Sequence, residues 1–172
     1  MTATAASRSR TPSRRQAALT AVAYVTYFVL AGIGQGTRSA ALNVIGTAWY
    51  FLVAVALGLL FARADRRVAV AAVAFAALGC VVQGIGQAVA DSALLTDAIA
   101  FFGLFEIALG YLVMRSGFAP RWLGAALALA GVVGFVVVLA DVPNTLRFAA
   151  VALSGLAELA LLLWLIARAV RG

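Results

Sequence analysis

Two glutamates stand in the middle of long apolar segments of this sequence. Glu106 lies in the run GLFEIALGYLVM and Glu158 in GLAELALLLWLI, each close to the centre. An ionisable side chain in the bilayer core costs about 2.5–3.5 kcal/mol on insertion scales and is a functional candidate by default. Because desolvation disfavours the carboxylate, we expect at least one of the two to hold its proton at neutral pH. A protonated carboxyl in an apolar site can act as a general acid, and an ionised neighbour as a base.

Polar and aromatic side chains in the neighbouring segments are expected to surround these acids. Gln83 and Gln87 share one helical face with Cys80, and Ser154 precedes Glu158 by one turn. The candidate substrate-binding residues are Tyr27, Gln35, Asn43, Tyr50, Gln83, Gln87, Phe102 and Ser154. Together they predict an interior pocket that opens outward or laterally, with the glutamates at its floor.

Structural roles are the alternative for these side chains. Interhelical hydrogen bonds hold many membrane bundles together, at about 0.6 kcal/mol each. We favour that interpretation for Asn43, Thr47 and Gln83, and packing or interface anchoring for Trp49 and the tyrosines. For the two glutamates we favour function, because a second carboxyl at matching depth is harder to explain by packing alone.

The elements that must position these residues follow from composition. The chain has 172 residues, of which 65% are apolar and 11% are charged, whereas soluble domains are about half apolar and a quarter charged. A helix crosses the hydrocarbon core with about 20 apolar residues. We expect six spans, at 17–34, 41–61, 68–90, 97–114, 122–140 and 148–167. Since these runs are too long for strands and a bilayer requires internally bonded backbone, the prediction is an all-α polytopic membrane protein, a bundle of six transmembrane helices.

The ends and loops predict the orientation of the bundle. Residues 1–16 are polar and rich in Ser, Thr and Arg, so we expect a disordered cytoplasmic tail before a single six-helix domain at 17–172. Eleven of the thirteen arginines fall on one side together with both termini, and Arg38 and Arg147 on the other. The positive-inside rule then places both termini in the cytoplasm. A signal peptide is the alternative for the first run, but the run is long and no cleavage site follows it.

Composition also excludes several classes of function. The chain contains no His and a single cysteine, Cys80, so the common zinc, haem and iron–sulfur sites are nearly excluded, and we predict no cofactor and no metal. The net charge is +7, and the charged residues lie between the apolar runs. Membrane orientation explains this distribution better than a nucleic-acid partner does. The Ala, Val, Gly and Arg bias is typical of a GC-rich genome, so we expect a multi-pass protein of a bacterial plasma membrane.

A faint internal repeat is present. The motif GIGQ occurs at 32–35 and again at 84–87, and the two glutamate segments are separated by the same 52 residues. Parallel repeats occur in membrane carriers. Chance matching in a chain rich in Ala, Gly and Leu is the alternative, and we favour it.

The segment FFGLFEIALGYLVMRSGFAPRWLGAALALAGVVGFVV, residues 101–137, carries a family resemblance. Its FFGL span start, its GYL, the loop RSGFAPRWLG and the following LAG are similar to those of a bacterial family of multi-spanning membrane proteins catalogued as domain of unknown function 4386. The resemblance implies a helical membrane protein with no assigned activity. Many members carry His where Phe105 stands here, so no role of that His transfers to this chain.

Three classes of function remain open. The first, which we favour, is a cofactor-independent membrane enzyme that uses Glu106 and Glu158 on a lipophilic, isoprenoid-like substrate, for isomerisation or cyclisation. Aromatic faces such as Tyr27, Tyr50 and Phe102 would stabilise a carbocation. The second is a small proton-coupled carrier, which would need to form a homo-oligomer, and the third a non-catalytic accessory or ligand-sensing protein. The expected partners are membrane lipids and a lipophilic small molecule.

Overall fold

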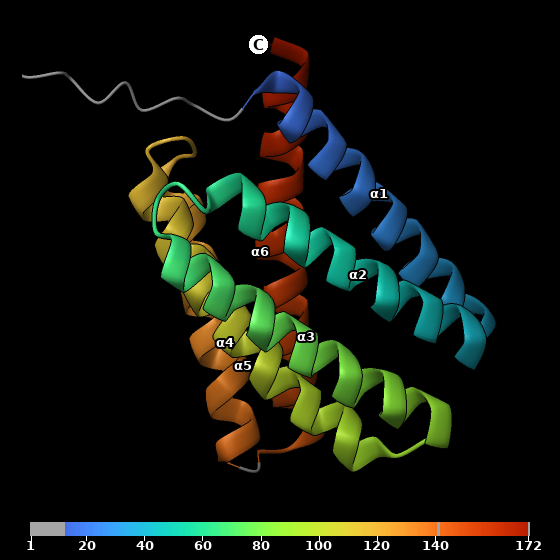
Figure 1. Ribbon diagram of the computed structural model, residues 1–172. Coiled ribbons are helices and arrows are strands. Elements are labelled where there is room, and N and C mark those ends of the chain that lie inside the picture. The colour runs from blue at the N-terminus through green and yellow to red at the C-terminus, as the bar shows by residue number, and fades with distance from the viewer. Residues whose placement is uncertain (1–12, 141, 172) are drawn as a thin grey trace, which may run out of the picture.

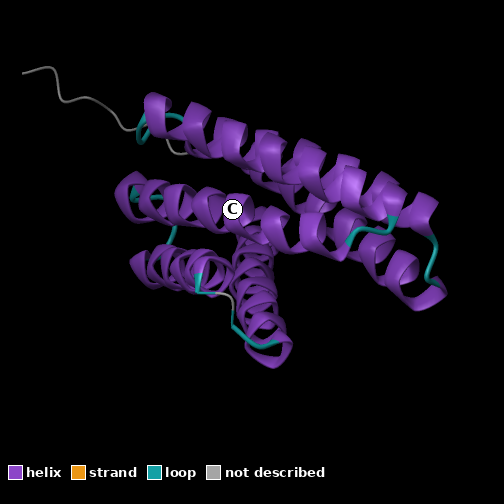
Figure 2. Ribbon diagram, turned by 90° about the horizontal axis from the view of Figure 1, so that it is seen from below, coloured by secondary structure: helices purple, strands orange, loops and turns teal. Residues whose placement is uncertain are grey.

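The computed structural model describes residues 13–140 and 142–171, which form six α-helices and no strand (Figure 1). Each helix is long and apolar enough to cross a membrane, so the predicted all-α membrane bundle is confirmed. The helices and their short connections are also clear in the view from below (Figure 2). Their bounds are α1 Arg14–Thr37, α2 Ala40–Phe61, α3 Arg66–Val89, α4 Ser92–Ser116, α5 Arg121–Leu139 and α6 Asn144–Arg171.

Two helices begin earlier than hydropathy predicts because polar side chains cap them. Ser13 accepts a hydrogen bond from the backbone of Gln16, whose side chain bonds back, and this capping box starts α1 inside the segment expected to be a tail. Residues 1–12 of that tail lie outside the described residues. Asp91 accepts from the first backbone N–H groups of α4, so that helix starts at Ser92 and Asp97 lies within it. Helix α4 therefore includes the expected fourth span, 97–114, and extends beyond it by five residues at its start.

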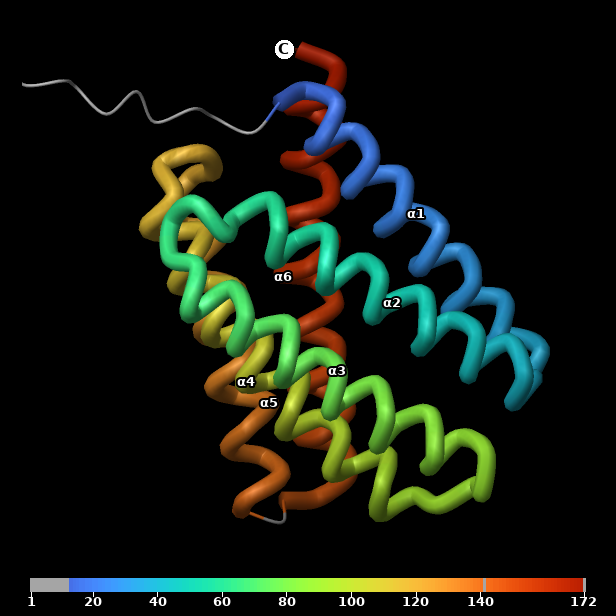
Figure 3. The backbone as a smooth tube through the Cα atoms, in the orientation of Figure 1, coloured from blue at the N-terminus to red at the C-terminus, as the bar shows by residue number. Residues whose placement is uncertain are grey.

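The helices follow one another as antiparallel neighbours, and α1 also packs against α6. The guanidinium of Arg14 donates to the carbonyl oxygen of Ala169 at 2.6 Å, which joins the start of α1 to the end of α6. Both described ends of the chain therefore lie at one end of the bundle, as the tube in Figure 3 shows. The assignment of that end to the cytoplasm remains a prediction.

The first two hairpins are built in the same way. Helix α3 begins and ends 52 residues after α1, and α4 begins 52 residues after α2. Arg38 and Ala90 close α1 and α3 in the left-handed conformation, with φ of 53° and 56°. The next residue in each turn donates its backbone N–H to the carbonyl of Gly34 or Gly86, at 3.1 and 2.9 Å. The two hairpins therefore share the same spacing of helices and the same turn geometry.

The closest helix contact joins α4 and α5 through glycines. A Cβ added to Gly110 would lie 2.5 Å from the carbonyl oxygen of Gly124, and one added to Gly131 would lie 2.4 Å from that of Gly103. A side chain larger than hydrogen at either of these two positions would therefore force the backbones apart. Gly134 of α5, by contrast, has only ordinary van der Waals neighbours.

The apolar core lies toward the end of the bundle that holds both termini. Many of its large fully buried side chains come from the second halves of α2, α4 and α6 and the first half of α5, among them Leu57, Phe61, Leu109, Leu112, Leu123, Leu161 and Leu165. From this packed end, α1 and α6 separate toward the other end of the molecule (Figure 3). Space in the bundle is therefore concentrated on the side away from the termini.

Candidate functional site

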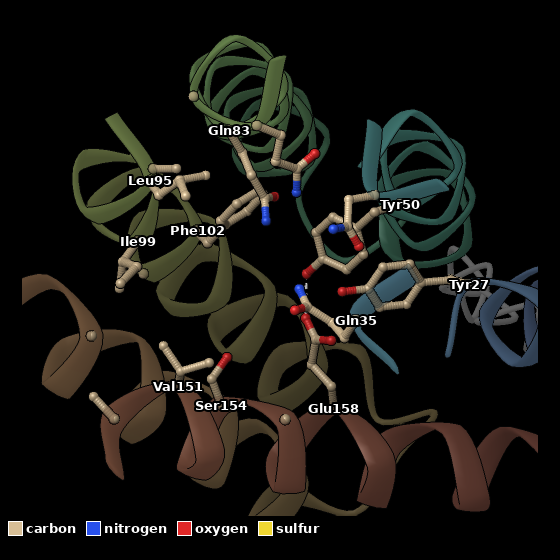
Figure 4. A pocket seen from close by; sticks show the side chains of 18 of the residues that line it. Tyr27, Gln35, Tyr50, Gln83, Leu95, Ile99, Phe102, Val151, Ser154 and Glu158 are labelled. Carbon is tan, nitrogen blue, oxygen red and sulfur yellow. Dashed lines mark hydrogen bonds between the residues drawn. The ribbon is translucent and has the colours of Figure 1, made fainter. Parts of the chain in front are cut away.

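A cavity of about 650 Å³ occupies the half of the bundle away from the termini. All six helices contribute to its wall, and the turns α1–α2 and α3–α4 form its outer rim. The structure brings every predicted site residue to this one cavity (Figure 4), namely Tyr27, Gln35, Asn43, Tyr50, Gln83, Gln87, Phe102, Glu106, Ser154 and Glu158. Their grouping follows from the helical spacing on which the prediction rests.

Glu106 reaches the cavity from the middle of α4. Its side chain is only 2% exposed, and the hydroxyl of Ser154 on α6 donates a hydrogen bond to its Oε1. The two helices share no extensive contact, so this bond crosses the cavity floor. A buried carboxyl needs such a partner, because burial without a hydrogen bond carries the full cost of desolvation.

Glu158 reaches the same floor from α6, one helical turn after Ser154. It is 5% exposed, and the phenol of Tyr50 on α2 donates a hydrogen bond to its Oε1. The fully buried hydroxyl of Tyr24 also lies near Glu158 but has no partner at hydrogen-bond geometry. Both glutamates line this one cavity. Whether they share a pocket could not be decided from the sequence, and the structure shows that they do.

Aromatic rings form the wall opposite α6. The ring centroids of Tyr27 and Tyr50 are 4.7 Å apart, and Phe102 meets Tyr50 edge-on with centroids 5.4 Å apart. In Figure 4 these rings border the cavity while Ser154 and Glu158 point toward them from α6. The floor therefore combines two carboxyls with three aromatic surfaces.

The amide side chains lie nearer the rim than the acids. Gln35 is exposed, and Asn43, Gln83 and Gln87 are half-buried. The hydroxyl of Thr47 lies 3.0 Å from Oε1 of Gln87, a contact between α2 and α3 that fits the predicted structural role of Thr47. Polar side chains thus line the cavity from its floor to its rim, whereas the opposite end of the bundle is filled by the apolar core.

Trp49 lies outside the cavity. Its indole N–H donates to the carbonyl of Ala23 at 2.8 Å and fixes α2 against α1, in line with the packing role favoured from the sequence. The sequence prediction missed other residues that line the cavity, among them Arg38, and the place of Tyr24 near Glu158. Arg38 lines the rim from the α1–α2 turn, one helical turn after Gln35, and that spacing could have indicated it. Tyr24 was assigned to packing, since nothing in the sequence places it beside Glu158.

Residues 87–169 match the family model Domain of unknown function (DUF4386). The resemblance predicted from residues 101–137 is therefore confirmed, over a longer stretch. No curated protein and no solved structure matches the chain at a significant level. The family description assigns no activity.

The family match divides the site between two parts of the chain. Both glutamates, Ser154 and Phe102 fall inside residues 87–169, and so does Gln87 at its first position. The aromatic and amide contributions of α1 and α2 lie before the matched segment. Among the residues that the structure describes, no three His, Cys, Asp or Glu side chains gather into a group that could hold a metal ion.

Proposed function

We propose that this protein is a cofactor-independent enzyme of a bacterial plasma membrane that moves protons on a lipophilic, isoprenoid-like substrate. One observation carries the proposal: Glu106 and Glu158 are both buried and line one cavity, each held by a donor from a different helix. Buried acid–base pairs of this kind are characteristic of catalytic sites. The apolar walls and the rim of amides suit a long hydrocarbon with a small polar end.

The hydrogen bonds suggest a role for each carboxyl. A phenol is a stronger donor than an aliphatic hydroxyl, so Glu158, which accepts from Tyr50, is better supported as the carboxylate. Glu106, which accepts from Ser154, is assigned as the acid. In this reaction Glu106 gives its proton to one carbon of a C=C bond, whose π electrons form the new C–H bond and leave a cation on the other carbon. Glu158 then removes a proton from a neighbouring carbon, and a C=C bond re-forms at a new position or after ring closure.

The aromatic wall would stabilise that cation. Ring faces attract a positive charge within about 6 Å of their centroids, and Tyr27, Tyr50 and Phe102 border the same cavity as the acids. Exclusion of water from the floor would also prevent capture of the cation by a hydroxyl.

Solvent deuterium tests the proposal without knowledge of the product. The full chain, reconstituted in nanodiscs with a bacterial lipid extract, is incubated in D₂O, and the lipids are analysed by mass spectrometry. Because the carboxyl protons exchange with solvent, proton transfer to carbon places deuterium at a C–H position that does not wash out. We expect protein-dependent labelling of one lipid class, and its loss in Glu106→Gln and in Glu158→Gln.

The matched control is Asp97→Asn, which removes an exposed carboxyl from the same helix as Glu106 but outside the cavity. It should label lipid at the wild-type rate. Absence of labelling by the wild-type protein across extracts of several bacteria would refute the enzyme proposal, as would full labelling by both glutamine variants.

A proton-coupled carrier is the second candidate, and the hairpin repeat favours it. Inward-facing carboxyls and internal repeats are common in secondary transporters. A carrier would leave lipids unlabelled in D₂O. In proteoliposomes it would move a proton across the membrane only when its substrate is added, and the two Glu→Gln variants would abolish that movement.

A further inference from the structure

The charges around the cavity are unbalanced. Glu106 and Glu158 lie on its floor, and in the part of the chain that the structure describes neither forms an ion pair with an arginine. The basic side chain among the described lining residues is Arg38, in the α1–α2 turn. Arg38 lies eleven residues beyond Tyr27 along the chain, or about 16 Å at 1.5 Å per residue. The floor therefore has two acids and no nearby basic side chain to balance them.

The surfaces that face these acids favour positive charge as well. Tyr50 packs against Tyr27 and Phe102, with ring centroids 4.7 and 5.4 Å away, so that three rings form a continuous wall. Aromatic faces present negative potential to a cation and attract it more strongly when water is excluded. The carboxyls and the aromatic rings on this desolvated floor therefore both attract positive charge.

We propose that this cavity binds lipophilic organic cations, with the ammonium or phosphonium centre between the carboxyls and the aromatic wall. The apolar side chains that line the cavity, among them Phe28, Ile99 and Val151, would hold the hydrophobic substituents. A cation entering the floor allows a carboxyl to release its proton and form an ion pair. An anion of the same shape meets two acids and no basic side chain at the floor, and a neutral molecule forms no ion pair with either acid.

This inference names the ligand class of the proposed catalytic site and rests on the proposed function in one respect, since both need Glu106 and Glu158 to face a ligand. Its test needs no turnover. Tetraphenylphosphonium and tetraphenylborate have nearly the same size and shape and opposite charge, so that a comparison of the two isolates the sign of the charge. Both are titrated into the full chain in nanodiscs of zwitterionic lipid, with empty nanodiscs subtracted.

We expect saturable binding of one phosphonium ion per chain and binding of the borate that is weaker by about tenfold or more. Glu106→Gln and Glu158→Gln should each weaken phosphonium binding by a similar factor, and Asp97→Asn should not change it. Because Gln keeps the size of Glu and can still accept a hydrogen bond, these variants are expected to fold, which size-exclusion chromatography checks. Phe102→Leu, which keeps an apolar side chain and removes a ring, should weaken the phosphonium alone.

Equal affinities for the two ions would overturn the inference, and so would unchanged phosphonium binding in both glutamine variants. The comparison of the two ions on the wild-type protein stands even where a variant fails to fold. Lipid labelling in D₂O distinguishes this failure from failure of the proposed function. If lipid labelling depends on Glu106 and Glu158 but the two ions bind equally, the enzyme proposal holds and the cation site is refuted. If the phosphonium binds selectively but no lipid is labelled, the cation site holds and the enzyme proposal is refuted.

Discussion

The phenol of Tyr50 on α2 and the carboxyl of Glu158 on α6 are joined by a hydrogen bond at the floor of the cavity. The two residues are 108 positions apart in the chain. Helices α2 and α6 share no extensive packing, so this bond joins α2 directly to a helix that otherwise contacts the first hairpin through α1. Removal of the donor is therefore expected to affect both stability and the site.

Tyr50→Phe should lower the free energy of unfolding by about 0.6–1.7 kcal/mol, the range measured for hydrogen bonds inside membrane bundles. It should also slow deuterium transfer to lipid, because Glu158 loses the donor that orients it. Tyr111→Phe is the control, since the hydroxyl of Tyr111 bonds to Arg115 in the last turns of α4, outside the cavity. Denaturation in mixed micelles measures the first effect, and equal destabilisation by the two variants would contradict the assignment.

Ser154→Ala should slow proton transfer while the fold persists. It removes the donor to Glu106, and the loss of one hydrogen bond of about 1–2 kcal/mol corresponds to roughly a 5- to 30-fold lower rate. Thr96→Ala, which removes a hydroxyl that bonds only within α4, should leave the rate unchanged. A wild-type rate in the Ser154 variant would show that this serine does not position the acid.

Gly131→Ala should destabilise the bundle by about 1–3 kcal/mol, because overpacking forces a shift of the backbone. The added methyl would lie 2.4 Å from the carbonyl oxygen of Gly103 on α4. At Gly84 the same change meets nothing within 4 Å, so Gly84→Ala should be neutral or slightly stabilising. Thermal denaturation of the two variants side by side decides the matter, and similar melting temperatures would exclude a close α4–α5 seam.

Ala90→Gly should stabilise the protein by about 1 kcal/mol, since a non-glycine residue in the left-handed region costs about 1–2 kcal/mol. Ala90 has φ of 56° at the end of α3. The matched substitution Ala74→Gly lies inside the same helix and should destabilise by about 1 kcal/mol through helix propensity. The denaturation midpoints of the two variants measure these opposite changes in stability. A loss of stability in both variants would show that the turn at Ala90 is not left-handed.

Topology can be tested with single cysteines in a Cys80→Ser background. Thr37 lies at the end of α1 and Arg66 at the start of α3, at opposite ends of the bundle, and both are exposed. The positive-inside rule predicts that a membrane-impermeant maleimide labels Thr37→Cys in intact spheroplasts and labels Arg66→Cys only after lysis. The reverse result would invert the predicted orientation and place both termini outside.

The sequence predicts the helices well, and the residues it singles out line one cavity, for a specific reason. Hydropathy defines the six spans, and 3.6-residue periodicity puts residues such as Gln83 and Gln87 on one face, which the bundle then turns inward. Matching depth of Glu106 and Glu158 could be read from their positions in two runs. What these residues do in the cavity remains a prediction.

Other features depend on tertiary contacts and could not be predicted. Asp97 interrupts the hydropathy of its run, so the start of α4 was placed there, whereas the cap at Asp91 decides it. The repeated turn was hidden because Arg38 and Ala90, rather than glycine, adopt the left-handed conformation. The donors to the two carboxyls come from distant helices, and no local pattern in the sequence pairs them.

The glycine seam between α4 and α5 has a consequence for motion. Where two backbones touch directly, no layer of side chains exists that could change rotamer and let one helix slide past the other. The pair carrying Glu106 should therefore move as one rigid block. Any widening that admits a bulky guest is therefore expected from the other helices, so the acid on α4 is the fixed reference and its partner on α6 the component that shifts.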